Sequence, residues 1–129
     1  FMNLELENNP LGNHAHWILR AVLATTFIMH GYPKLGYDMG MGFIGYFVGI
    51  FEVFGAIFLL VGPFTKDIIT RVGGLMISII MIGAIFVVHL GQGWKMHATA
   101  ESIPYTQGFE WQALLLGVSL LFVLKGNKT

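Results

Sequence analysis

The apolar run VGIFEVFGAIFLLVG, residues 48 to 62, contains one charged residue, Glu52. A charged side chain at the centre of a lipid-embedded helix costs about 2.5 to 3.5 kcal/mol on insertion scales, so it turns toward a partner inside the protein or loses its charge. Arg20 lies at nearly the same depth if the two segments form neighbouring helices. We therefore predict a buried Arg20–Glu52 ion pair. The pair is either a clamp between helices or the lining of a polar pocket that holds a ligand oxygen or relays a proton.

A second polar group is expected near one end of the helices. His30 and Lys34 follow the first apolar segment, His89 ends the third, and Glu110 lies near the start of the fourth. Imidazole, ammonium and carboxylate groups together can bind the oxygens of a quinone and exchange protons with it. Two histidines with a carboxylate could also ligate a metal, or two histidines a haem, but neither spacing is specific. We expect a quinone pocket here, no metal site and no covalently bound cofactor.

The composition indicates which solvent surrounds these side chains. Of 129 residues, 55% are hydrophobic and 11% are charged, outside the usual range of soluble domains. The stretch from Val72 to Trp94 contains no Asp, Glu, Lys or Arg and is longer than the roughly 20 residues that cross a bilayer. A soluble helical domain of this size would have too little interior for such helices, so we predict an integral membrane protein.

The order of apolar segments predicts an all-α fold, a membrane-embedded four-helix bundle in a single domain over residues 1 to 129. We place the spans at about residues 16–32, 43–61, 68–90 and 105–124. Pro33 and Pro63 are expected just past helix ends, and Pro104 in a first helical turn. The amino-terminal stretch lacks the basic region and cleavage site of a signal peptide, so the chain is treated as mature.

Basic residues predict the orientation of the bundle. The side that carries both termini holds four of them, with Arg20 nearby, against two on the other side; the four are Lys66, Arg71, Lys125 and Lys128, and the two are Lys34 and Lys95. This excess favours cytoplasmic termini. The location that fits is the inner membrane of a prokaryote.

Charge and cysteine content exclude several function classes. Seven basic residues balance seven acidic ones, so no net field directs the chain to nucleic acid. The absence of cysteine excludes disulfides, thiol catalysis and cysteine-ligated clusters made by these residues alone. Small residues four apart, Gly45 with Gly49 and Gly74 with Ser78, permit close helix packing.

The motifs together resemble those of the DoxX/DoxD-like family of small four-helix membrane proteins. The resemblance is carried by Arg20, by HGYPKLG at residues 30 to 36, by FEVFGAIFLLVGPFT at residues 51 to 65, and by FEW around Glu110. Ala56 replaces the second glycine of the family's Gly-Gly pair, a change between small residues that should preserve packing. The family positions in this chain are Arg20, Gly31, Lys34, Glu52, Gly55, Gly62 and Glu110. Of these, Gly31, Gly55 and Gly62 are expected at helix contacts.

The resemblance implies a quinone-linked or redox-associated membrane subunit. Three functions stay open. The first is a subunit that supports assembly of a larger membrane redox complex, and the second is an oxidoreductase subunit that binds quinone. The third is a small-solute transporter or maturation factor. In the first two cases we expect membrane lipid and other membrane-protein subunits as partners, because four helices without a recognisable cofactor ligand set are not expected to complete electron transfer alone.

Overall fold

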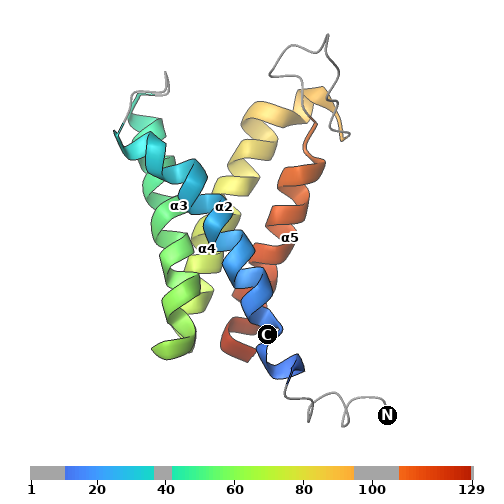
Figure 1. The fold of residues 1–129 in the computed structure, drawn as a ribbon. Coiled ribbons are helices and arrows are strands. Elements are labelled where there is room, and N and C mark those ends of the chain that lie inside the picture. The colour runs from blue at the N-terminus through green and yellow to red at the C-terminus, as the bar shows by residue number, and fades with distance from the viewer. Residues whose placement is uncertain (1–10, 37–41, 95–107, 129) are drawn as a thin grey trace.

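The computed structural model describes residues 11–36, 42–94 and 108–128, and the regular structure within these ranges is all helical, without strands. Four α-helices form the bundle (Figure 1): α2 (His16–Gly36), α3 (Phe43–Val61), α4 (Asp67–Ala84) and α5 (Glu110–Lys125). Short helical turns precede α2, join α3 to α4, and follow α4 and α5. The described parts of the chain begin and end at the same end of the bundle.

A helix lies in each of the four predicted segments, and α3 has the predicted bounds. The predicted end of the first segment was wrong. Pro33 lies inside α2 rather than after it, and the helix continues to Gly36. An interior proline normally breaks a helix, but here the last turn of α2 packs against α3 and is held in place by that contact. The helical path of α4 continues through a π-helix at Ile85–His89 and a 3-10 turn at Leu90–Gln92. Pro104 and the expected start of the fourth segment lie outside the described residues.

Glycines and serines allow the helices to approach one another closely. Gly31 of α2 faces Gly49 of α3, where a Cβ on either would lie 3.0 Å from the carbonyl oxygen of the other. Gly55 of α3 faces Gly73 of α4 in the same way. On the next face of α4, Gly74 lies against α5, and Ser78 Oγ is 2.8 Å from Ser119 Oγ of α5. Three successive close contacts therefore join α2 to α3, α3 to α4 and α4 to α5.

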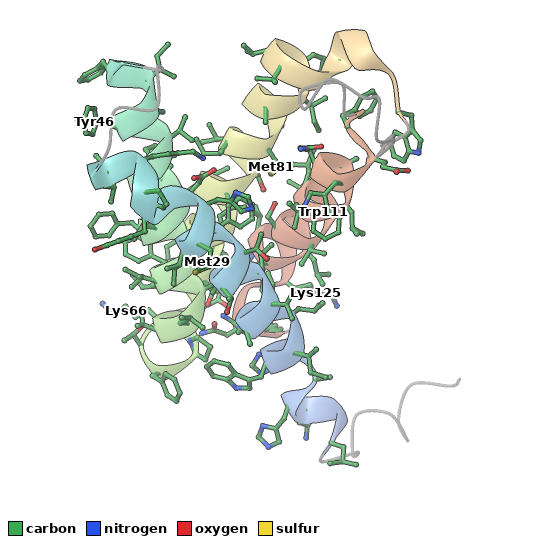
Figure 2. The ribbon with its side chains drawn as sticks, turned by 45° about the horizontal axis from the view of Figure 1, so that its top comes forward. Met29, Tyr46, Lys66, Met81, Trp111 and Lys125 are labelled. Carbon is green, nitrogen blue, oxygen red and sulfur yellow. The ribbon has the colours of Figure 1, made fainter. Side chains whose placement is uncertain are left out.

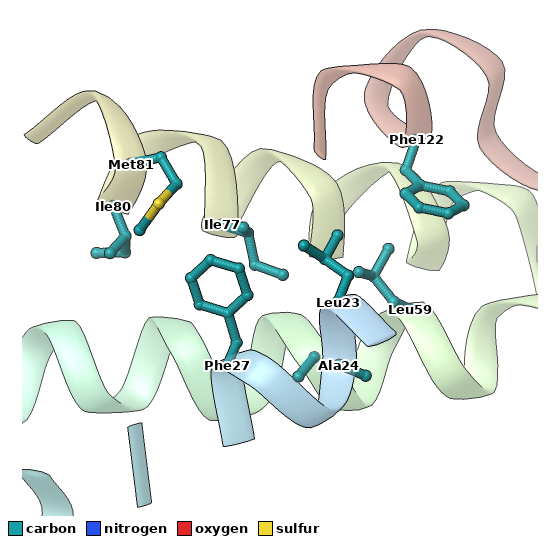
Figure 3. Packing of buried hydrophobic residues seen from close by; sticks show 9 residues of the cluster. Leu23, Ala24, Phe27, Leu59, Ile77, Ile80, Met81 and Phe122 are labelled. Carbon is teal, nitrogen blue, oxygen red and sulfur yellow. The ribbon is translucent and has the colours of Figure 1, made fainter. Parts of the chain in front are cut away.

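The remaining interior is filled by a small apolar core contributed by all four helices (Figure 3). Its buried members are Leu23, Ala24, Phe27, Ala56, Leu59, Ile77, Ile80, Met81 and Phe122. The side chains of Arg20, Glu52 and Thr70 are buried as well.

The outer faces, by contrast, are apolar. Phe43, Val87 and Leu124 are among many large hydrophobic residues that are exposed. Charged groups inside and apolar groups outside are what a lipid solvent favours, whereas soluble proteins rarely expose such continuous apolar area. Two helical segments, Phe43–Phe64 and Asp67–Val88, are long and apolar enough to cross a membrane.

The contact between α4 and α5 gives a test of packing. A Cβ added at Gly74 would lie 2.7 Å from the carbonyl oxygen of Ser119, whereas one added at Gly117 of α5 would meet open space. We expect Gly74→Ala to lower the free energy of unfolding by about 1–3 kcal/mol through overpacking. Gly117→Ala is the control and should be neutral or slightly stabilising, because alanine favours helix. Thermal unfolding in detergent measures both, and equal stability of the two variants would contradict this packing.

Candidate functional site

The most strongly buried ion pair among the described residues joins α2 to α3. Lys34 Nζ donates a hydrogen bond to Glu52 Oε2 over 2.7 Å, and the two side chains are 17% and 5% exposed. The predicted Arg20–Glu52 pair is therefore corrected: the structure does not bring these two residues together. Arg20 lies three turns before Gly31 along α2, while Glu52 lies beside Gly31, so the helix itself holds the guanidinium away from the carboxylate.

The two glycines of the α2–α3 contact set the geometry of this pair. A Cβ built at Gly31 would lie 2.8 Å from Glu52 Cβ, and one built at Gly49 would lie 3.0 Å from Lys34 Cβ. Each charged residue thus packs over the glycine of the other helix. On both helices the charged residue follows its glycine by three positions, which places glycine and charge on one face. This repeated spacing is the sequence signal by which the Lys34–Glu52 pair could have been found.

An apolar groove adjoins the ion pair. The cavity has a volume of about 450 Å³ and lies between the first half of α3 and the last part of the α4 path, with Lys34 and Glu52 in its wall. Its apolar lining includes Ile44, Phe47 and Val48 of α3 together with Ile80, Ala84 and Val87 of the α4 path. Figure 2 places Met81 of α4, which also lines the groove, inside the bundle. Pockets of this size with few polar groups suit amphipathic small molecules.

Arg20 forms a separate polar cluster near the opposite end of the bundle. Its side chain is fully buried, and all five of its N–H groups find acceptors. Nε donates to His16 Nδ1 over 2.9 Å. Nη1 donates to the Leu59 carbonyl and to Thr70 Oγ1, and Nη2 to the Gly126 carbonyl and Asn127 Oδ1. The five acceptors come from α2, α3, α4 and the turn after α5, so one side chain joins all four helices.

The Arg20 cluster contains no carboxylate among the described residues. The guanidinium is balanced by neutral oxygen and nitrogen acceptors and by the ring of Phe122, whose centroid lies 4.8 Å from Arg20 Cζ. Asn127 extends the cluster by donating from Nδ2 to the Gly62 carbonyl over 3.1 Å. Because every donor of Arg20 is used within the protein, this site is structural, and a ligand would have to displace one of these bonds.

Other bonds hold the end of α5 to the start of α4. Arg71 Nη1 donates to the carbonyls of Val123 and Leu124, each over 2.9 Å. Asp67 accepts from Arg71 Nε over 2.6 Å and from the backbone N–H of Asn127 over 2.7 Å. These contacts satisfy carbonyls that a helix end leaves without partners. Thr70, Asn127 and Asp67 were not singled out from the sequence, because their roles depend on contacts between distant segments.

The second predicted polar group is only partly assembled. His30 is exposed on α2, one turn before Lys34. Glu110 begins α5, where its backbone N–H donates to the Trp94 carbonyl over 2.9 Å. The start of α5 lies on the other side of the bundle from the α2–α3 pair (Figure 1), so Glu110 does not join Lys34 and Glu52. The side chain of His89 lies outside what the structure describes. Within the described residues, no group of three or more His, Asp or Glu side chains is arranged to hold a metal.

Comparison with known proteins identifies the family. The family model DoxX matches residues 15–90. The chain belongs to the DoxX family. No curated protein and no solved structure matches it. The matched region contains Arg20 and the Lys34–Glu52 pair, whereas Glu110 and the Gly126 and Asn127 acceptors of the Arg20 cluster lie outside it. The DoxX match and the two apolar helices make this a membrane protein.

The geometry around Arg20 generates a stability prediction. Lysine offers three donors in place of five, so Arg20→Lys loses at least two of these buried hydrogen bonds. We expect the free energy of unfolding to fall by roughly 3 kcal/mol. The matched control is Arg71→Lys, where a side chain that is 35% exposed can exchange its bonds for water and the loss should stay below about 1 kcal/mol. Denaturant unfolding in detergent compares the two, and a similar small loss at both sites would contradict the role of Arg20.

Proposed function

We propose that this DoxX-family protein is an integral membrane subunit of a larger quinone-linked redox complex, which it helps to assemble and to which it contributes a binding groove for a quinone. Electron transfer is assigned to neighbouring subunits. The absence of cysteine rules out thiol chemistry and cysteine-ligated clusters within these residues. What the chain can offer is a shaped apolar space and a hydrogen-bonding pair.

The observation that carries the proposal is the position of the Lys34–Glu52 pair in the wall of an apolar groove. A quinone has an apolar body and two carbonyl oxygens. An ammonium can donate to a carbonyl oxygen, and a carboxylate can accept from the hydroxyl of the reduced form. The same groups can take up or release the protons that accompany quinone reduction. The groove would orient the head group while its Ile, Phe and Val lining contacts the ring.

The proposed arrangement in the membrane has four crossing helices with cytoplasmic termini, in the inner membrane of a prokaryote. It is supported by the apolar outer faces of the bundle and by the position of the basic residues. Lys66, Arg71, Lys125 and Lys128 lie at the end where the described residues begin and end, whereas Lys34 lies toward the other end. The excess of basic residues faces the cytoplasm in most membrane proteins.

Labelling of single cysteines tests this topology, because the chain has no cysteine of its own. We expect a membrane-impermeant maleimide added to intact cells to label Gly91→Cys, at an exposed position after α4, and to leave Thr65→Cys and Lys128→Cys unlabelled. Opening the cells should make the last two reactive. Labelling of Thr65→Cys in intact cells would contradict cytoplasmic termini.

Gentle purification from the native membrane tests the function. We expect larger subunits to co-purify at fixed stoichiometry and organic extraction to release quinone. Glu52→Gln should lower the quinone content several-fold, because the pair that faces the head group is lost, while the subunits stay associated. The control is Asp67→Asn, an acidic residue far from the groove, which should leave the quinone content unchanged. A solitary protein without quinone would refute the proposal.

A purely structural subunit is the second candidate. The continuous apolar outer faces favour it, since such faces can pack against other membrane subunits as well as against lipid. Fixed-stoichiometry co-purification with no quinone in the extract, in both the natural protein and Glu52→Gln, would support this candidate over the first.

A further inference from the structure

The groove combines an apolar lining with two opposite charges held 2.7 Å apart. The ion pair sums to zero charge, and it lies where the surrounding surface offers few polar groups. A ligand that brings its own charge would leave one ion without a counter-ion in this apolar space. A neutral ligand would leave the balance intact.

The pair also retains hydrogen-bonding capacity toward the groove. Within the described residues, Lys34 donates to Glu52 and to no other side chain or carbonyl, so two of its three N–H groups remain. Glu52 accepts through Oε2, and its Oε1 has no partner among the described residues. The groove therefore presents adjacent donors and an acceptor from an ion pair without net charge.

We propose that the Lys34–Glu52 pair makes the groove selective for uncharged amphipathic ligands whose head group carries carbonyl or hydroxyl oxygens. Alkyl anions and alkyl cations of similar length are excluded by the charge that they would leave unbalanced. This inference rests on the proposed function, in that it takes the groove to be a ligand site, and it names the class of ligand. Lys34 and Glu52 are the residues that determine specificity.

The volume and the direction of the groove agree with such a ligand. About 450 Å³ accommodates a substituted ring and part of an alkyl chain. The lining runs from Glu52 to Ile44 on α3 and from Ile79 to Val88 on the α4 path. Several of these apolar residues are also exposed on the outer face of the bundle. A ligand dissolved in lipid can therefore reach the ion pair without passing through water.

Removing one charge should reverse the selectivity. Glu52→Gln leaves the Lys34 ammonium alone in the groove, so the groove should now take an anion. Lys34→Gln leaves the carboxylate alone and should favour a cation. Because an uncompensated ion in an apolar site is strongly disfavoured, we expect each gain to be tenfold or more in affinity, about 1.4 kcal/mol or above.

The test uses the full chain in phosphatidylcholine nanodiscs and three labelled probes. Decyl-benzoquinone is neutral, decyl sulfonate is always anionic, and decyltrimethylammonium is always cationic. The charge of each probe therefore does not change with pH. Binding is measured by equilibrium dialysis below micellar concentrations, and uptake by empty nanodiscs is subtracted. The natural protein should bind the quinone at least tenfold more tightly than either ion. Glu52→Gln should gain affinity for decyl sulfonate, and Lys34→Gln should gain affinity for decyltrimethylammonium.

Several results would overturn the inference. The first is sulfonate binding by the natural protein within threefold of quinone binding, and the second is no detectable quinone binding. The third is a folded Glu52→Gln variant, judged by circular dichroism, that gains no affinity for the sulfonate. If this variant does not fold, Lys34→Gln tests the same claim with the opposite probe, and a folded Lys34→Gln that gains no cation binding overturns it.

The outcome separates this inference from the proposed function. Reversal of selectivity in nanodiscs, with no quinone in the native complex, would refute the quinone-linked role and support the neutral-ligand groove. Quinone in the native complex, with no reversal in either folded variant, would support the role and refute the part assigned to the ion pair.

Discussion

The close approach of α2 and α3 at Gly31 and Gly49 is the contact on which the candidate site depends. Without side chains at these two positions, the helix backbones come close enough for Lys34 to pack over Gly49 and for Glu52 to pack over Gly31. In this arrangement the Lys34 ammonium donates a hydrogen bond to the Glu52 carboxylate. A larger residue at either glycine would separate the helices, open the ion pair and change the adjoining wall of the groove.

Arg20 and Glu52 are both buried charged side chains, but they find their hydrogen-bond partners in different ways. Arg20 is satisfied entirely by neutral acceptors from four helices, so its charge is spread over hydrogen bonds that also hold the bundle together. Glu52 has one hydrogen-bonded ionic partner, Lys34, and keeps an oxygen without a bond among the described residues. Saturated groups build structure, whereas partly satisfied groups are available to a ligand. Arg20 and Glu52 both belong to the family motif, but this difference makes the Arg20 cluster structural and the Lys34–Glu52 pair a candidate binding site.

The expected helices, their order and the burial of Arg20 and Glu52 followed from residue types alone. Long apolar runs require helices, and charges within them must lie inside, whatever the details of packing. The partners of these charges did not follow. Depth along each predicted span placed Arg20 near the level of Glu52, but the contact of Gly31 with Gly49 sets the register of the two helices and puts Glu52 three turns away from Arg20. Pro33 illustrates the same limit, because contact with α3 keeps helical a turn that local preference would end.

By itself the sequence determined that the chain forms apolar helices with a few internal charges and the motifs of the DoxX family. Only the tertiary structure decided that Glu52 pairs with Lys34, that Arg20 joins α2 to the turn after α5, and that an apolar groove adjoins the ion pair. The reason is physical. Hydrophobicity and helix formation are properties of neighbouring residues, whereas an ion pair or a cavity depends on the rotation and crossing of helices, which distant glycine contacts set.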